Sequence, residues 1–163
     1  MELDYSGLLA MGETADETLD ETQYLTFRLD NQEYGLPIIE VQEIKGWTRM
    51  TPVPNSPSHM LGVLNLRGTI IPVIDLRARF GLPSKEHDEF TVIMVVSMGE
   101  RLAGLVVDSV SDVISAPDDA VRDNPEANSN IDQRFFRGLV EANGKLVILL
   151  DVMQISDDIQ QGS

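Results

Sequence analysis

The side chains that could support catalysis are few, and their spacing favours none of the common reactions. His59 and His87 have no second ligand three or four residues away, so they do not form a helical metal pair, and both are interpreted as surface histidines. Asp108 and Asp112 could be drawn as a carboxylate pair, but strand-end and turn roles are favoured. The chain has no cysteine and no glycine-rich phosphate-binding motif. The sequence therefore predicts no enzyme, no metal and no cofactor.

Arg67 is the residue that points most directly to binding. It lies in the turn-like sequence NLRG, where a guanidinium group could bind a partner's carboxylate through two hydrogen bonds. A later segment of similar pattern has Asn143 at the same place, so the turn itself does not require a base. A solvated arginine on a turn is the alternative interpretation, and both stay open at this point.

Charge and composition exclude several classes of partner. The formal net charge of −15 would repel the phosphates of nucleic acid and the anionic surface of a membrane. No apolar stretch approaches the roughly 20 residues needed to cross a bilayer, and the first residues do not resemble a secretory signal. These features favour a cytoplasmic protein without direct membrane insertion.

The elements that position these residues occur twice in the chain. In the first block the two copies are 69 residues apart, as Gly35 and Gly104 show. In the second block they are 76 residues apart, and the matching pairs are Gly62 with Gly138, Gly68 with Gly144 and Asp75 with Asp151. The later copy thus has seven extra residues, within the polar stretch DNPEANSNID. This order and spacing predict an internal duplication.

Local signals within each copy are those of short strands. The segment QYLTFRLD alternates, which places Leu25, Phe27 and Leu29 on one face of a strand. Asn143-Gly144 is typical of a type I′ hairpin turn, and Arg67-Gly68 occupies the same place in the first copy.

Other signals end these strands. Asp75 and Asp151 are predicted to cap single helical turns. Pro72 cannot donate a ladder hydrogen bond, so its strand is expected at a sheet edge or at a bulge. The fold class is therefore all-β, with two small barrels and a few short helices.

Three segments in the same order carry a family resemblance. EYGLPIIEVQEIKGW, GVLNLRGTIIPVIDLRARFGL and AGLVVDSVSDVI resemble the CheW family of bacterial chemotaxis coupling proteins. The resemblance covers about residues 22–156. It implies two five-stranded SH3-like barrels with an apolar seam between them, and no catalytic activity.

The resemblance also implies partners. CheW proteins bridge the cytoplasmic tips of methyl-accepting chemoreceptors to the regulatory domain of the histidine kinase CheA, so that receptor state controls kinase autophosphorylation. Localisation at receptor arrays on the inner face of the membrane follows from this. The family's contact positions correspond here to Val41, Glu43, Ile44, Gly62, Arg67, Val110 and Val113. The resemblance does not divide them between receptor and kinase.

Three segments of the chain are expected. Residues 1–21 carry seven acidic and no basic side chains and are predicted to be a disordered tail. Residues 22–156 form the two packed barrels, with a boundary near residues 81–91 and room for strands to be exchanged between them, and residues 157–163 are a second tail. The alternative function is a small-molecule or peptide-binding barrel without a signalling role. It predicts a pocket inside one barrel, whereas the Val, Ile and Leu content favours filled interiors.

Overall fold

Ten strands make up most of the computed structural model, which describes residues 21–123 and 131–156. The first copy of the repeat forms β1 (Glu21–Leu29), β2 (Gln32–Pro37), η1 (Ile38–Glu40), β3 (Val41–Gly46), β4 (Met60–Leu66), β5 (Thr69–Asp75) and α2 (Leu76–Arg79). The second copy forms β6 (Val92–Met98), β7 (Arg101–Val107), β8 (Ser109–Pro117), η2 (Asp118–Ala120), η3 (Gln133–Phe135), β9 (Phe136–Ala142), β10 (Lys145–Leu150) and α3 (Val152–Ile155). The five strands and the final helical turn of each copy match one another, as the duplication predicts, whereas the 3₁₀ helices η1, η2 and η3 do not.

Both expected tails lie outside the described residues, apart from one residue. Glu21, the last residue of the predicted acidic tail, is the first residue of β1 and pairs with Pro117 of β8. The predicted tail is therefore one residue too long, because backbone pairing with β8 extends β1 back to this position.

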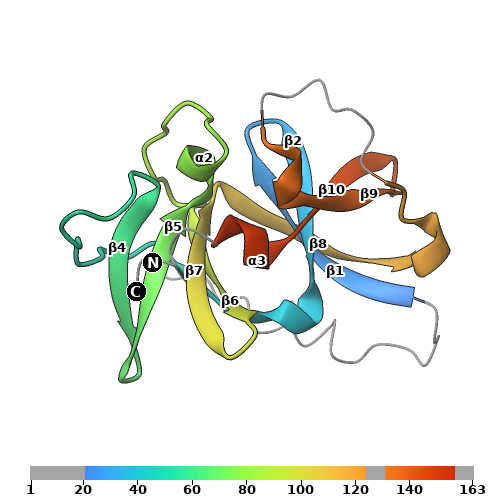
Figure 1. Cartoon of the computed structure of the whole chain (residues 1–163). Helices are drawn as coiled ribbons and strands as arrows, with labels where there is room; N and C mark the ends of the chain where they lie inside the picture. Colours follow the sequence, from blue (N-terminus) through green and yellow to red (C-terminus); the bar gives the residue numbers. More distant parts are fainter. Residues whose placement is uncertain (1–20, 124–130, 157–163) are drawn as a thin grey trace.

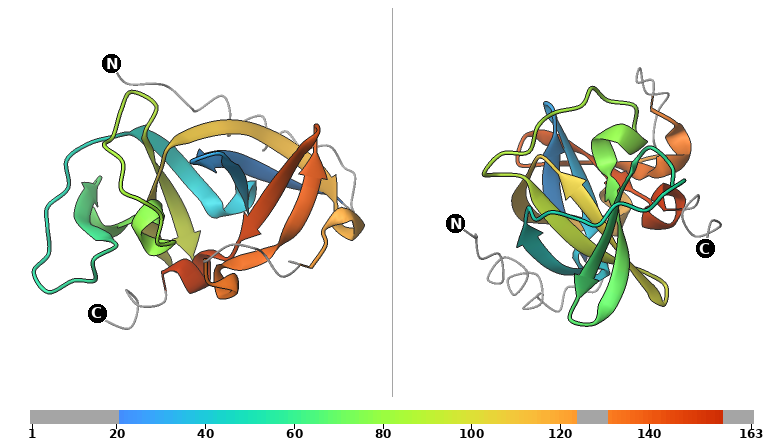
Figure 2. Two further views of the ribbon diagram at one scale, coloured as in Figure 1. Left: turned by 90° about the horizontal axis from the view of Figure 1, so that it is seen from above. Right: turned by 90° about the vertical axis from the view of Figure 1, so that its left-hand side faces the viewer.

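The strands form two five-stranded sheets, each built from both copies of the repeat (Figure 1). The first sheet has the order β8-β1-β2-β10-β9, and the second has the order β3-β6-β7-β5-β4. Replacing each strand by its match in the other copy converts one order into the other. Each copy thus contributes its first two strands to one sheet and its last three to the other. The expected boundary at residues 81–91 separates the copies but not the sheets. Figure 2 shows the two sheets side by side from above.

Each sheet is closed into a barrel by one antiparallel bridge at a matching place. In the second sheet Thr51 and Val63 exchange backbone hydrogen bonds of 3.0 and 2.8 Å, which joins the chain after β3 to β4. In the first sheet Arg122 and Leu139 exchange two bonds of 2.8 Å. Val63 and Leu139 are 76 residues apart, so the closure follows the repeat. The sheets are called the first barrel (with β1) and the second barrel (with β6) below.

The predicted turns and caps are confirmed. Arg67 and Gly68 have φ of 51° and 93°, and Asn143 and Gly144 have φ of 54° and 77°, which are the two positive values that a type I′ turn requires. Each helical turn begins at its predicted cap, because the Asp75 carboxylate accepts from the N–H of Arg77 and the Asp151 carboxylate accepts from that of Met153.

The expectation for Pro72 is wrong. Its strand β5 lies between β4 and β7, and the register shift is on β4, between Met60 and Gly62. Val63 directs its backbone groups to Thr51, so the Val63–Pro72 pair is not hydrogen-bonded and the proline nitrogen faces β7. Pairing with β7 begins only at Val73. The proline is tolerated because it lies just before that ladder starts.

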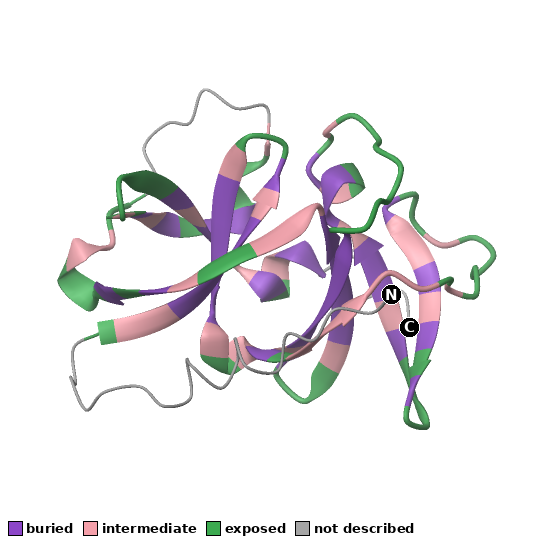
Figure 3. Ribbon diagram, turned by 180° about the vertical axis from the view of Figure 1, so that it is seen from behind, coloured by how far each residue is buried: buried purple, intermediate pink, exposed green. Residues whose placement is uncertain are grey.

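Three apolar clusters fill the molecule. The largest contains residues of both sheets, among them Leu25 and Phe27 of β1 and Met94 and Val96 of β6, and it lies between the barrels. The other two clusters fill the individual barrels. Strand β1 is accordingly buried on both faces, with Leu25 in the central cluster and Tyr24 in the first barrel. Buried strand segments gather along the middle of the molecule in Figure 3.

Candidate protein-binding surface

Strand β3 carries three of the predicted contact residues. Val41 is buried in the central cluster, with 7% of its surface exposed. Ile44 packs against the same cluster and is half-buried. Glu43 lies between them and is half-buried. Within the described residues, β3 is the terminal strand of its sheet and pairs in register only with β6.

Strand β8 carries two more contact residues at matching positions in the other barrel. Val110 and Val113 pair with Phe27 and Leu25 of β1, and both are half-buried against the central cluster. The central cluster thus brings together apolar residues from β3 and β8, although these strands belong to different barrels. This arrangement agrees with the apolar seam that the resemblance implied.

Arg67 forms an ion pair with a carboxylate of the same chain, that of Glu43. Its Nη2 atom donates a hydrogen bond of 2.6 Å to Oε1 of Glu43, and the arginine side chain is 72% exposed. The hydrogen bond from Arg67 to Glu43 holds the pKa of the guanidinium above its ordinary value. The exposed ion pair adds little to stability, but it fixes the direction in which both groups face the solvent.

The sequence reasoning named both residues of this pair but did not predict that they pair with each other. In the second copy the matching residues are Asp112 and Asn143. There the aspartate binds the backbone N–H of Val113 instead, at 2.7 Å. The acid is kept in the second copy and only the base is lost, so comparing the copies marks Arg67 but does not identify Glu43 as its partner.

Gly62 is needed for closure of the second barrel. It is buried at a φ of +151°, and a Cβ atom there would lie 2.4 Å from the backbone oxygen of Thr51. Its match, Gly138, meets the backbone oxygen of Arg122 at 2.8 Å in the same way. Packing of the closing bridge therefore accounts for this glycine, and its assignment to partner binding stays a prediction.

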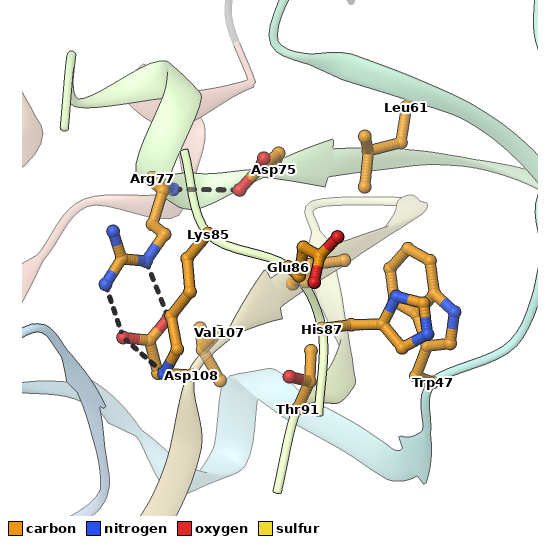
Figure 4. A pocket seen from close by; sticks show the side chains of 11 residues that line it. Trp47, Leu61, Asp75, Arg77, Lys85, Glu86, His87, Thr91, Val107 and Asp108 are labelled. Carbon is orange, nitrogen blue, oxygen red and sulfur yellow. Dashed lines mark hydrogen bonds and ion pairs between the residues drawn. The ribbon is translucent and has the colours of Figure 1, made fainter. Parts of the chain in front are cut away.

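A second ion cluster, which sequence reasoning missed, lies where the chain crosses from the second barrel to the first (Figure 4). Arg77 of α2 donates to both carboxylate oxygens of Asp108, at 2.8 and 2.9 Å, and also binds Asp30. Burial raises the pKa of Asp108, but the hydrogen bonds from Arg77 and from the backbone of Asp30 outweigh it and lower that pKa. Asp108 is thus a strand-end residue, as expected, with a buried arginine as partner.

The matching crossing, from the first barrel to the second, is apolar. The matches of Asp108 and Arg77 are Ile39 and Met153, which are 81% and 47% exposed. The acid beside this crossing, Glu40, has a pKa raised chiefly by burial, although Arg137 at 3.6 Å opposes that shift. The two crossings share a backbone plan but not their side-chain chemistry.

The histidines differ from the expectation in one case. His87 is exposed and stacks on Trp47, with ring centroids 4.4 Å apart, at the edge of the hollow in Figure 4. The prediction that His59 is a surface residue is wrong, since it is 8% exposed; its carbonyl accepts from the backbone N–H of Asp75, which holds it against β5 just before β4 begins.

Within the described part of the chain, no group of three or more His, Asp or Glu side chains is placed to hold a metal ion. Over the same residues no helix has the length and apolar character needed to cross a membrane.

Comparison with known proteins agrees with this architecture. The CheW-like domain family matches residues 23–160. A chemotaxis protein CheW of Klebsiella aerogenes is 39% identical over 150 residues, covering 92% of this chain and 90% of that protein. A probable chemotaxis protein CheW of Rhizobium etli is 36% identical over 132 residues, covering 81% of this chain and 85% of that protein.

A solved structure supports the same assignment. The crystal structure of the scaffolding protein TtCheW from Thermoanaerobacter tengcongensis superposes with a TM-score of 0.75 at 33% identity, covering 80% of this chain and 88% of that one. The barrels, the closing bridges and these matches lead to one conclusion. The chain belongs to the CheW family of non-enzymatic adaptors and is a chemotaxis scaffold.

Proposed function

We propose that this protein couples methyl-accepting chemoreceptors to the histidine kinase CheA, so that receptor state controls kinase autophosphorylation. One observation carries the proposal: half-buried valine and isoleucine side chains of β3 and β8 lie on one shared core, and the Glu43–Arg67 pair lies on the same barrel as β3. Partly exposed apolar side chains on a shared core suit the apolar face of a helical receptor tip.

The proposed division of labour is between apolar contact and charge. Ile44 and Val113 would supply contact area, since their side chains already pack on the core and lose little freedom on binding. The Glu43–Arg67 pair would set the register of the partner, because its orientation is fixed before binding. CheA would bind a separate edge through its regulatory domain, and the complex would sit in the cytoplasm at receptor arrays.

The test is reconstitution of CheA and receptor in membranes, with ATP-dependent autophosphorylation measured in the presence and absence of this protein. We expect receptor control of the kinase only when the protein is present. If the kinase responds to receptor equally well without it, and pull-downs recover neither partner, the proposal is wrong.

A charge exchange sharpens this test. Glu43→Lys places a second cation beside Arg67 and should weaken binding to the receptor, to CheA or to both. The double variant Glu43→Arg with Arg67→Glu restores the internal ion pair but reverses the charges that a partner meets. We expect the double variant to fold normally and still fail in coupling. Full recovery of coupling would mean that the pair acts only within the chain.

A further inference from the structure

The end of the first barrel holds a polar hollow of about 160 Å³. Its polar lining consists of Thr26, Glu33, Ser111, Asp112, Asn143 and Lys145. Four of these residues lie on β1, β2 and β8, and the β9–β10 hairpin covers the hollow from the other side. The hollow therefore lies between the strands at this end of the first barrel, next to the apolar cluster that contains Val147.

The same place in the second barrel is filled by apolar side chains. The matches of Thr26, Glu33 and Ala142 are Val95, Leu102 and Leu66. Val95 and Leu66 are 0% and 7% exposed, and Leu102 packs against their cluster. Over this end lies the Glu43–Arg67 ion pair, whose matches in the first barrel are Asp112 and Asn143. The fold can thus close a barrel end with leucine and valine, but the first barrel has a carboxylate there.

The carboxylate of Glu33 is buried but only partly paired within the described residues. The residue is 6% exposed, and its Oε2 atom is buried without a hydrogen-bond partner among the described residues. This same Oε2 atom forms an ion pair with Nη1 of Arg28 at 3.6 Å, and the Arg28 side chain is 42% exposed. A buried carboxylate loses hydration and needs donors in return, and one loose ion pair supplies too few of them.

Among the neighbouring groups, Thr26 and Asp112 offer acceptors, while Ser111, Asn143 and Lys145 also carry donors. The Thr26 hydroxyl donates to the carbonyl oxygen of Asp112, at 3.2 Å, and so presents its lone pairs to the hollow. Asp112 uses Oδ1 for the N–H of Val113 and keeps its second oxygen. Lys145 is the single cation of the lining, and it is exposed at the rim. Two carboxylates and a hydroxyl suit a group with several N–H donors.

We propose that this hollow binds an alkylammonium group, with Glu33 as its counter-ion. An ammonium has three donors and a compact charge, and the adjoining Val147 and Ala142 would contact its first methylenes. A metal ion fits less well, because the described residues hold no group of three metal-binding side chains. The group belongs either to a free primary amine or to a lysine of a docked protein, and the chemistry of recognition is the same.

The test is a titration of the full chain with n-butylammonium chloride, followed through backbone amide signals by NMR. We expect saturable shifts at Thr26, Ser111 and Asn143, and no such shifts with n-butanol, which has the same carbon chain without the charge. Glu33→Gln should weaken binding at least about tenfold, whereas the exposed acid in the matched control Glu141→Gln lies outside the hollow and should leave binding unchanged.

A second variant keeps the test informative if Glu33→Gln folds poorly. Glu33→Leu copies the second barrel, so it should raise the melting temperature and abolish binding. If n-butylammonium gives no saturable shifts, or if n-butanol shifts the same signals equally, the hollow holds only solvent or any apolar chain, and the proposal is overturned.

A further measurement identifies the source of the amine. If a partner's lysine enters the hollow, Glu33→Gln should weaken capture of CheA or of the receptor, and n-butylammonium should compete with that partner. If a free amine enters, both captures should stay unchanged while the shifts remain.

Discussion

The two barrels share one strand order but differ in how their ends and crossings are built. The end of the second barrel is apolar beneath an ion pair, whereas the end of the first is a polar hollow. At the crossings the chemistry is reversed, with a buried Arg77–Asp108 pair at one and exposed Ile39 at the other. The backbone plan accepts either set of side chains, so the fold itself does not require these differences.

The largest effect is expected at the charged crossing. Arg77→Met introduces the residue of the matching position and leaves the Asp108 carboxylate buried without its arginine. We expect a loss of about 3–5 kcal/mol in the free energy of unfolding, measured by urea denaturation. The double variant Arg77→Met with Asp108→Ile reproduces the apolar crossing and should recover most of that loss. If the double variant is as unstable as the single one, the two crossings are not interchangeable.

The closing bridges offer a smaller effect that also compares the copies. Gly62→Ala places a Cβ 2.4 Å from the Thr51 oxygen at a φ that alanine avoids, so we expect a loss of about 2–4 kcal/mol. Gly138→Ala meets its oxygen at 2.8 Å without a positive φ and should lose less. Thermal unfolding followed by circular dichroism measures both, and equal losses would contradict this account of Gly62.

The acids beside the two crossings should respond to pH with opposite signs. The folded-state pKa of Asp108 lies below 3.8, so its contribution to stability is present above pH 3.8 and is lost as the pH falls through the folded value. The folded-state pKa of Glu40 lies above 4.5, so its ionisation destabilises the fold at neutral pH.

We expect Asp108→Asn to destabilise at pH 7 and to flatten the stability curve below pH 3.8. Glu40→Gln should not destabilise at pH 7. Urea denaturation from pH 2.5 to 7 checks both, and equal losses at pH 7 would refute the difference.

The smallest effect on stability is expected at the hairpin turn. Arg67→Asn copies the second barrel, and asparagine accepts the positive φ of 51° there. The exposed ion pair is lost, so stability should change by about 0.5 kcal/mol or less. Receptor control of the kinase should nevertheless fall, as measured in the reconstituted system. A large stability loss with normal coupling would instead make Arg67 a structural residue.

Much of the local structure could be predicted because it depends on neighbouring residues. The Asn143-Gly144 turn, the Asp75 cap and the repeat itself all follow from short-range chemistry. The burial of His59 and the tolerance of Pro72 could not be predicted, since both depend on which strand lies alongside. The same holds for the Glu43–Arg67 and Arg77–Asp108 pairs, which join residues 24 and 31 positions apart across strands whose order the sequence does not state.

Each barrel contains strands from both copies of the repeat, and this limits how a half-length ancestor could fold. Cutting the chain between α2 and β6 would yield two half-length chains, neither of which contains all five strands of a barrel. A half-length ancestor could complete both barrels only by pairing with an identical chain, with each chain donating three strands to the other's sheet. Fusion of two such genes would free each half to diverge, since a substitution would no longer have to be suitable in two places at once.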